Sequence, residues 1–294
     1  MSAARLVLPL LAAALLLAPP AHGQSENLLV NPDFNHDLSG WTPSAPEGAV
    51  WSAVDAAGDP ASGSALLVRQ YLLLTSAGIP VVAGDRYRLA GQTLFGAADA
   101  GGGAFFRVRW HGPACLGLLR EDVFGRLLGQ SGEGWAESAR AFAAPAGAAC
   151  GTVGVGVAAI RPVTFEAHFD RLRFEPFEPT CEPTETVLCL NGGRYRVEVS
   201  WQIAAGDTGP GHAVPLTGDS GAFWFFGPDN LELMVKVLDG CPVNGHVWVF
   251  AAGLTNVEVE IRVTDTATLE VETHTNPQGT PFRPIQNVLG FPCS

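Results

Sequence analysis

The sequence predicts an all-β protein built from two β-sandwich domains. Three observations lead to this prediction. Apolar residues recur with period two in both halves of the chain, turn sequences separate these runs, and a proline-rich segment divides the halves. The chain has 294 residues, enough for two domains, and 47% hydrophobic residues, enough to form their cores.

The first 23 residues are expected to be a cleaved secretory signal peptide. Arg5 precedes an apolar run over residues 6–17, and Ala21 and Gly23 place small residues at −3 and −1 of a cut before Gln24. The run is shorter than the ~20 apolar residues that span a bilayer, so we expect no membrane insertion. A retained N-terminal anchor is the alternative. The mature protein is therefore expected to be secreted, periplasmic or at the cell surface.

Apolar runs predict five strands in the first half of the chain. They lie near residues 65–74, 86–95, 104–110, 152–158 and 163–174. Residues 116–128 are the one candidate helix, although Gly117 and Gly125 weaken it.

A short, stiff linker is predicted over residues 176–180. Three prolines between positions 176 and 183 fix the backbone φ and remove amide donors, so neither a helix nor a central strand continues through this segment. The linker separates an N-terminal domain, residues 24–175, from a C-terminal domain, residues 181–294.

Strict alternation of apolar and polar residues predicts at least three strands in the second half. They cover residues 194–201, 231–237 and 257–264. The turn sequences near them are Asn191-Gly192-Gly193, Asp239-Gly240, Asn244-Gly245 and Asn276-Pro277-Gln278-Gly279. Short strands with such turns are typical of an antiparallel β-sandwich.

An even number of cysteines in an exported chain predicts disulfides. The spacing does not match the CxxC or CxxH patterns of a zinc site. If the two domains are separate, Cys115 pairs with Cys150. The remaining four cysteines then have three possible pairings. They are Cys181, Cys189, Cys241 and Cys293.

Charge and composition exclude some functions. There are 17 basic and 29 acidic residues, which gives a net charge of −12. Nucleic-acid binding needs a basic face for the phosphates, so we expect no nucleic-acid partner.

Two short motifs resemble functional sites of enzymes, but the sequence around them does not fit those sites. Residues 218–221, Gly-Asp-Ser-Gly, resemble the nucleophile loop of serine proteases, yet no segment supplies the general-base histidine of that chemistry. Residues 154–159 fit a dinucleotide-binding pattern, but no helix follows them. We therefore predict no catalytic residue and no enzyme activity.

Several motifs of the first half occur in the order found in one family. They are NLLVNPDF (27–34), LSGWT (38–42), VAGDRYRL (82–89), GW (134–135) with FAAPAG (142–147), and FDRLRF (169–174). Together these segments resemble a secreted carbohydrate-binding module of the galactose-binding-like jelly-roll type, over residues 26–175. The resemblance implies a jelly roll that binds a glycan or polysaccharide.

Exposed aromatic rings are the expected ligand-binding residues, because sugar rings stack on them. The candidates are Trp110, Tyr71 and Trp51. Trp110 is preferred because it ends a strand and a polar loop follows. However, Trp110 shares one face of the strand with Phe106 and Val108, which argues for a buried ring. The tryptophans that match structural positions of the family are Trp41 and Trp135.

The resemblance also implies one structural calcium ion. Asp170 matches the aspartate that holds the ion in the family, and Asn35 stands where the family often has an acidic residue. Carboxylate and amide oxygens suit this cation. Alternatively, Asp170 only caps a β-bulge, which is expected here because the apolar face of the strand switches between Phe169 and Leu172.

The second half is similar to an uncharacterised cysteine-bearing domain at the C-termini of exported bacterial proteins. The matching segments are residues 188–197, 221–226, 229–241 and 276–282. This resemblance implies no activity, although the domain could bind a protein partner. The predicted function is therefore that of a secreted, non-catalytic glycan-binding protein. The alternative is a structural or adhesive extracellular protein whose sandwiches bind proteins.

Overall fold

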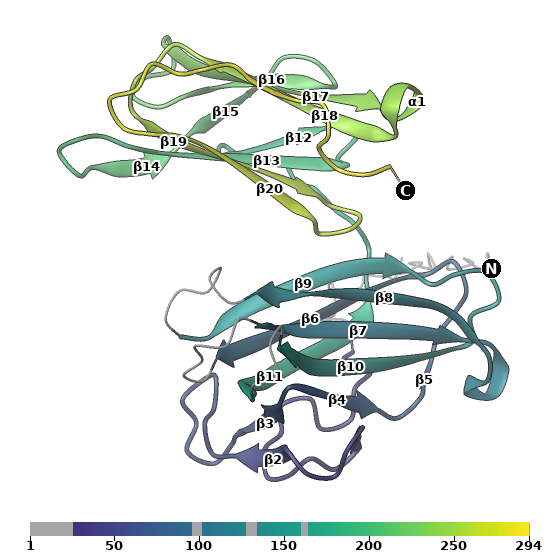
Figure 1. Ribbon diagram of the computed structural model, residues 1–294. Helices are drawn as coiled ribbons and strands as arrows, with labels where there is room; N and C mark the ends of the chain where they lie inside the picture. Colours follow the sequence, from purple (N-terminus) through teal and green to yellow (C-terminus); the bar gives the residue numbers. More distant parts are fainter. Residues whose placement is uncertain (1–25, 96–101, 128–133, 160–163, 294) are drawn as a thin grey trace, which may run out of the picture.

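The computed structural model describes residues 26–95, 102–127, 134–159 and 164–293, and the predicted signal peptide lies outside them. The protein is nearly all β, with four sheets whose strand pairs are antiparallel. The sheets form two sandwiches, one from each half of the chain (Figure 1). The predicted fold class is confirmed. Within the described residues, no helix is both long enough and apolar enough to cross a membrane.

The N-terminal sandwich consists of sheets A and B. The strands of sheet A are β1 (Trp41–Pro43), β4 (Tyr71–Ser76), β5 (Ile79–Pro80), β7 (Gly102–His111), β8 (Leu118–Leu127) and β10 (Cys150–Ala159). Those of sheet B are β2 (Ala49–Ser52), β3 (Ser64–Arg69), β6 (Arg86–Phe95), β9 (Ala136–Ala143) and β11 (Phe165–Pro176). Sheet A has the order β1-β4-β10-β7-β8, with β5 beside β10, and sheet B has the order β2-β3-β11-β6-β9. The chain crosses repeatedly between the sheets, as in a jelly roll.

Alternation along the strands fills the space between sheets A and B with aromatic and aliphatic side chains. The largest fully buried ones include Phe34, Phe106, Trp110, Phe165, Phe169 and Phe174. A short 3-10 turn, η1 (Pro113–Cys115), follows β7. It carries one half of the Cys115–Cys150 disulfide, which confirms that predicted pairing.

The helix predicted over residues 116–128 is wrong, because strand β8 occupies most of this segment. Phe124 points into the core, where its ring stacks on Phe106 at a centroid distance of 5.1 Å, whereas Val123 is exposed. This alternation lets β8 pair with β7 along its whole length. Long-range pairing of this kind cannot be read from the segment alone.

The predicted β-bulge lies in β11. The register between β11 and β6 shifts between Asp170 and Arg173. Arg171 has a left-handed backbone with φ of 51°. The bulge turns Leu172 into the core while Asp170 is also buried.

The C-terminal sandwich consists of sheets C and D. The strands of sheet C are β12 (Val187–Leu190), β13 (Tyr195–Gln202), β14 (Thr208–Pro210), β19 (Glu258–Asp265) and β20 (Val271–Asn276). Those of sheet D are β15 (His212–Pro215), β16 (Ser220–Trp224), β17 (Leu231–Gly240), β18 (His246–Gly253) and β21 (Ile285–Asn287), and a single helical turn, α1 (Cys241–Asn244), joins β17 to β18. Sheet C has the order β12-β13-β19-β20, with β14 beside β13, and sheet D has the order β15-β16-β17-β18-β21.

Two disulfides join the four cysteines of the second half. They link Cys181 to Cys189 and Cys241 to Cys293. One of the three possible pairings is thereby selected. The second disulfide ties α1 to the C-terminal segment.

The turn between β19 and β20 contacts the N-terminal sandwich at strands β6 and β9. Arg86 Nη1 donates to Ala267 O at 2.8 Å, Ala141 N donates to Thr268 O at 2.9 Å, and Arg140 pairs with Glu270. The turn is braced from within, because the buried Asp265 carboxylate accepts two hydrogen bonds from Arg194. Sheet C therefore faces the N-terminal sandwich, and sheet D lies on the far side (Figure 1).

Candidate functional site

Two aromatic side chains lie on the outer face of sheet A. The Phe105 ring occupies the space above Gly156 on the neighbouring strand β10, where a Cβ atom would come within 2.4 Å of the ring. Tyr71 on β4 is parallel to Phe105 within 24°, at a centroid distance of 6.0 Å, and is 57% exposed. Because Gly156 has no side chain, the Phe105 ring can lie against the backbone of the sheet. The pair forms an aromatic surface held on three strands.

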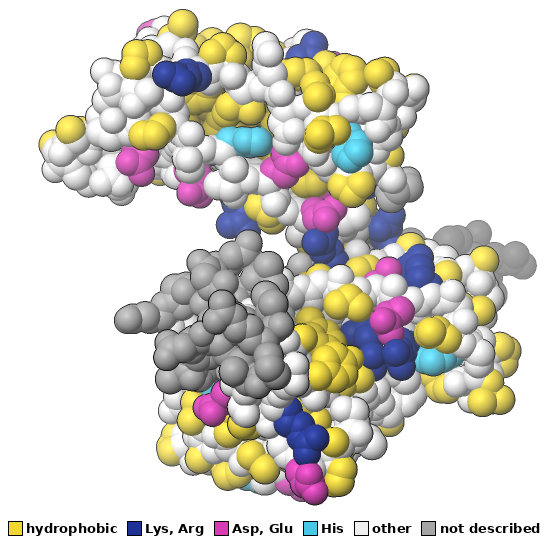
Figure 2. Space-filling view, viewed as in Figure 1, with side chains coloured by type: hydrophobic (Ala, Val, Ile, Leu, Met, Phe, Trp, Pro, Cys, Tyr) yellow, Lys and Arg dark blue, Asp and Glu magenta, His cyan; other side chains and the backbone are white. Residues whose placement is uncertain are grey.

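Charged groups stand beside these rings. Arg107 follows on the same face of β7 and is only 6% exposed, with its side chain across Gly154 of β10. Its Nη1 lies 3.6 Å from Glu121 Oε2, and Arg109 also pairs with Glu121. Burial, together with the charge of Arg109, lowers the pKa of the Arg107 guanidinium from its ordinary value. Figure 2 shows a hydrophobic group beside basic and acidic side chains on this face, over β7 and β10.

The outer face of sheet A therefore offers two kinds of contact to a ligand. The rings offer an apolar aromatic surface, and the ion-paired side chains offer fixed donors and acceptors at its edge. Gly154 and Gly156 in β10 leave the room in which Arg107 and Phe105 lie against the sheet. Sequence reasoning found Tyr71 and missed Phe105, Arg107, Arg109 and Glu121. The alternation of side chains along β7 could have revealed the outward residues, because Phe105, Arg107 and Arg109 alternate with the core residues of that strand.

Trp110 does not belong to this face, so the preferred ligand-binding candidate is corrected. Its side chain is 0% exposed and packs against Tyr87 and Phe174 in the core. The Nε1 atom donates to Asp122 Oδ2 at 2.6 Å, which satisfies the polar end of the indole. Strict alternation along β7 decides the outcome, and the position of Trp110 at the end of the strand does not override it.

Trp51 lies on strand β2, at the edge of sheet B, and is 38% exposed. Its Nε1 donates to Phe34 O at 2.6 Å, and its ring covers Gly63. The structure therefore does not bring Trp51 together with Tyr71. Of the two tryptophans expected in the core, Trp41 is buried and Trp135 is half-buried, with its ring edge against His168.

Asp170, the predicted calcium ligand, is a buried carboxylate. Its oxygens accept hydrogen bonds from Ala56 N at 2.9 Å and Arg171 N at 2.6 Å. Burial, assisted by the nearby charges of Asp55 and Asp33, raises its pKa to about 6 against these hydrogen bonds. Among the ion pairs of the described residues, none involves Asp170.

Asn35, the second predicted ligand, lies in the same neighbourhood. Its Oδ1 accepts a hydrogen bond from Ser62 Oγ at 2.9 Å. Burial opposes ionisation of Asp55, but hydrogen bonds from the backbone amides of Asp59 and Ala57 and from the Ser62 side chain lower its pKa. Ser62 and Asp55 thus link Asn35 to Asp170. This cluster of oxygen atoms is the donor type that Ca²⁺ prefers, so the residues fit the predicted ion.

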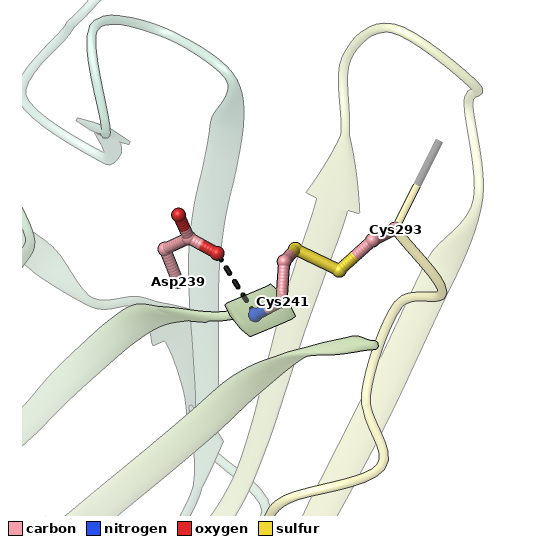
Figure 3. A group of neighbouring side chains, drawn as sticks. All are labelled: Asp239, Cys241 and Cys293. Atoms are coloured by element: carbon pink, nitrogen blue, oxygen red, sulfur yellow. Dashed lines mark hydrogen bonds between the residues drawn. A yellow bond between two sulfur atoms is a disulfide. The ribbon is translucent and has the colours of Figure 1, made fainter. Parts of the chain in front are cut away.

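A second group of possible metal ligands does not form a metal site. Asp239, Cys241 and Cys293 lie within 4.8 Å of one another. However, the two sulfur atoms are joined in a disulfide, so neither is a thiolate (Figure 3). Asp239 Oδ1 accepts the amide hydrogen of Cys241 at 2.9 Å, so this carboxylate is already engaged with the backbone.

Comparison with known proteins gives fold-level likeness only. No protein-family model matches the sequence, and no curated protein matches it. Among solved structures, the enzymatically active domain of bacteriophage CBA120 tailspike protein 4 is 13% identical, with a TM-score of 0.41; the match covers 51% of this chain and 21% of that chain. TmCBM61 in complex with β-1,4-galactotriose is 15% identical over 52% of this chain and 100% of that chain, with a TM-score of 0.38.

A tandem structure extends the comparison to both sandwiches. The CBM22-1–CBM22-2 tandem domain of Paenibacillus barcinonensis Xyn10C is 12% identical, with a TM-score of 0.39, and the match covers 89% of this chain and 88% of that chain. Two of these neighbours are thus carbohydrate-binding modules. Because all three TM-scores are below 0.5, the functional inference rests on the residues of this chain.

Proposed function

We propose that the N-terminal sandwich binds a glycan chain on the outer face of sheet A. The observation that carries this proposal is the near-parallel ring pair of Phe105 and exposed Tyr71 beside the ion-paired Arg107. The sequence motifs that resemble carbohydrate-binding modules lie in the same sandwich, which supports the same ligand class.

The chemistry of the face suits a sugar. Pyranose rings have apolar faces that stack on aromatic rings and a rim of hydroxyl groups that need hydrogen bonds. Arg109 and Glu121 can donate to and accept from such hydroxyls, since each is only partly buried. Their mutual ion pair orients both groups before the ligand arrives, so less side-chain entropy is lost on binding.

The proposed role is binding without catalysis. Glycoside hydrolysis generally uses two carboxyl groups flanking the bond, one of them with a raised pKa. Glu121 is the carboxylate identified beside the rings, and it is already paired with two arginines. The protease-like Ser220 lies instead in sheet D, 8% exposed, where its hydroxyl contacts that of Thr217.

We further propose a structural Ca²⁺ site held by Asp170, Asp55 and Asn35. When bound, the ion would supply positive charge to a buried carboxylate and fix the 33–35 loop against β11. The raised pKa of Asp170 supports this assignment, because the carboxylate lies beside two others in a buried position. The three disulfides support an exported protein, since such bonds persist in oxidising compartments.

A broad glycan and polysaccharide array, probed with the mature protein, tests the proposed function. We expect binding to at least one class of polysaccharide, and competition by the soluble oligosaccharide of that class. Binding to no glycan by a protein with an intact fold would overturn the proposal. The adhesive alternative would then be preferred.

A further inference from the structure

The outer face of sheet D departs from the usual pattern of an antiparallel sheet. One face of such a sheet normally packs in the core and the other is polar. The outward positions of β16, β17 and β18 are Ser220, Ala222, Trp224, Glu232, Met234, Lys236, Leu238, His246, Trp248, Phe250 and Ala252. Only Lys236 and the buried Glu232 among them are Asp, Glu, Lys or Arg, although this face is not covered by the N-terminal sandwich (Figure 1).

Sheet C of the same sandwich provides the contrast. The outward positions of β13 and β19 are Arg196, Glu198, Ser200, Gln202, Glu258, Glu260, Arg262 and Thr264. Five of these eight are charged. The apolar character of sheet D is therefore a property of that face and not of the whole domain.

Large side chains on the sheet D face are exposed and partly fixed. Met234 is 51% exposed, between Ala222 and Ala252 on the neighbouring strands. The Trp248 indole lies against Gly240, where a Cβ atom would come within 2.2 Å of Nε1, and that nitrogen donates to Asn244 Oδ1 at 3.0 Å.

An apolar groove of about 320 Å³ runs along one end of the face. Its lining includes Leu231, Leu233, Met234, Ala252 and Leu254. Glu232 also lines the groove, but it is buried and accepts a hydrogen bond from Asn230. The groove therefore offers hydrocarbon surface rather than charge.

This composition fits a protein partner better than a sugar. Aromatic residues and methionine are enriched in protein interfaces, and charged residues are depleted in their centres. A sugar would need hydrogen-bonding groups across the face, whereas Met234, Leu238, Phe250 and Ala252 offer none. A contiguous exposed apolar surface rimmed by polar residues is typical of an interaction site.

The distribution of charge favours a second copy of the chain as that partner. The chain carries a net charge of −12, so two copies repel each other at most contact surfaces. The one carboxylate among the outward positions of β16, β17 and β18 is Glu232, which is buried, while the outer face of sheet C carries three. Two copies can thus approach through sheet D with less repulsion than through sheet C.

The area of the face is sufficient for such a dimer. Five strands at a spacing of about 4.8 Å, with the central ones about 30 Å long, give a flat footprint of roughly 500–700 Å². A stable interface removes about 800 Å² of accessible surface from each partner. Side-chain relief makes accessible surface larger than the flat footprint, so the face reaches this size.

We propose that the protein forms a two-fold symmetric dimer in which the outer faces of sheet D pack on each other. The same patch serves both copies, as in an isologous interface. Each dimer carries two sheet A faces. This proposal is independent of the proposed glycan binding.

Sedimentation analysis of the mature chain over a range of concentrations tests the dimer. The wild type is expected to reach the dimer mass. Met234→Glu is expected to weaken dimerisation by at least about 30-fold, because two carboxylates would face each other in a desolvated centre. Ser200→Glu adds the same charge to the outer face of sheet C and is expected to leave the dimer intact.

Thermal unfolding of both variants separates dissociation from misfolding, since Met234 and Ser200 are both exposed and neither substitution should disturb the monomer fold. A wild type that stays monomeric at its highest soluble concentration would overturn the proposal. If Met234→Glu then lost glycan binding, the face would be assigned to a glycan instead. If the Met234→Glu protein folds and dimerises as strongly as the wild type, the proposal is also overturned.

Discussion

The outer faces of sheets A and D both expose aromatic rings, but they differ in what surrounds the rings. On sheet A, Phe105 lies over Gly156 and is followed by Arg107, which is ion-paired with Glu121. On sheet D, Trp248 lies against Gly240 and is followed along the strand by apolar residues. A glycine beneath a ring therefore does not determine which class of ligand the face binds. The polar groups beside the ring decide whether the face suits a hydroxyl-rich sugar or another protein surface.

The two faces of strand β7 can be compared in the same way. Substitution of Trp110, on its inner face, is expected to have the largest effect on stability. Trp110→Ala removes a fully buried ring between Tyr87 and Phe174, so we expect the free energy of unfolding to fall by about 3–5 kcal/mol. Denaturant unfolding of the variant measures this loss. If Trp110→Ala retained wild-type stability and lost glycan binding, the assignment of the two faces of β7 would be reversed.

Calcium gives an intermediate effect, confined to the N-terminal sandwich. An ion that binds only the folded state stabilises it by about 2.7 kcal/mol at a concentration 100-fold above its Kd. We expect Ca²⁺ to raise the melting temperature of the wild type and not that of Asp170→Ala. The matched variant Asp59→Ala removes an exposed carboxylate from the loop that carries Asp55, and it should keep most of the shift. An equal shift in Asp170→Ala would remove this residue from the site.

The pH dependence of stability without calcium follows from the same carboxylate. The pKa of Asp170 is about 6 in the folded state and near its ordinary value of 3.8 when unfolded, so the folded state binds more protons between these values. Without calcium, stability is therefore expected to fall as pH rises through this window, by up to about 3 kcal/mol. Calcium needs the ionised carboxylate, so its stabilising effect should grow over the same window. Melting temperatures between pH 4 and pH 7, with calcium and with a chelator, would reveal both trends, and parallel curves would contradict them.

The smallest expected effect concerns the contact between the sandwiches. Arg140 and Glu270 form a partly exposed ion pair, which contributes about 0–1 kcal/mol. Glu270→Gln should therefore leave glycan binding and the melting temperature almost unchanged, and any loss should shrink at high salt. A large destabilisation measured by calorimetry would show that the contact contributes more than its exposure suggests.

Much of the fold could be predicted from local patterns. Period-two alternation indicated the strands, the switch of apolar face indicated the bulge at Asp170, and the grouping of cysteines indicated the Cys115–Cys150 bond. Strand β8 was missed because its pairing with β7 is a long-range interaction. The pairing of the other four cysteines likewise depends on which chain segments the fold brings together.

The candidate site was harder to predict, for a physical reason. Phe105 and Phe106 are adjacent phenylalanines, and the sequence cannot tell which of them has a glycine on the neighbouring strand that leaves room for an outward ring. Only the register Phe105–Gly156 settles this. Tyr71 was found because sequence reasoning sought rings that were not needed for the core, but its partner Phe105 lies 34 positions further along the chain.

The most direct test of glycan binding by sheet A is calorimetric titration of Tyr71→Ala with the polysaccharide selected on the array. Tyr71 is 57% exposed, so the variant should fold normally and bind at least about 10-fold more weakly. Phe226→Ala removes an equally exposed ring from the C-terminal sandwich and should bind like the wild type. Wild-type affinity in a folded Tyr71→Ala protein would contradict the assignment of the glycan to the outer face of sheet A.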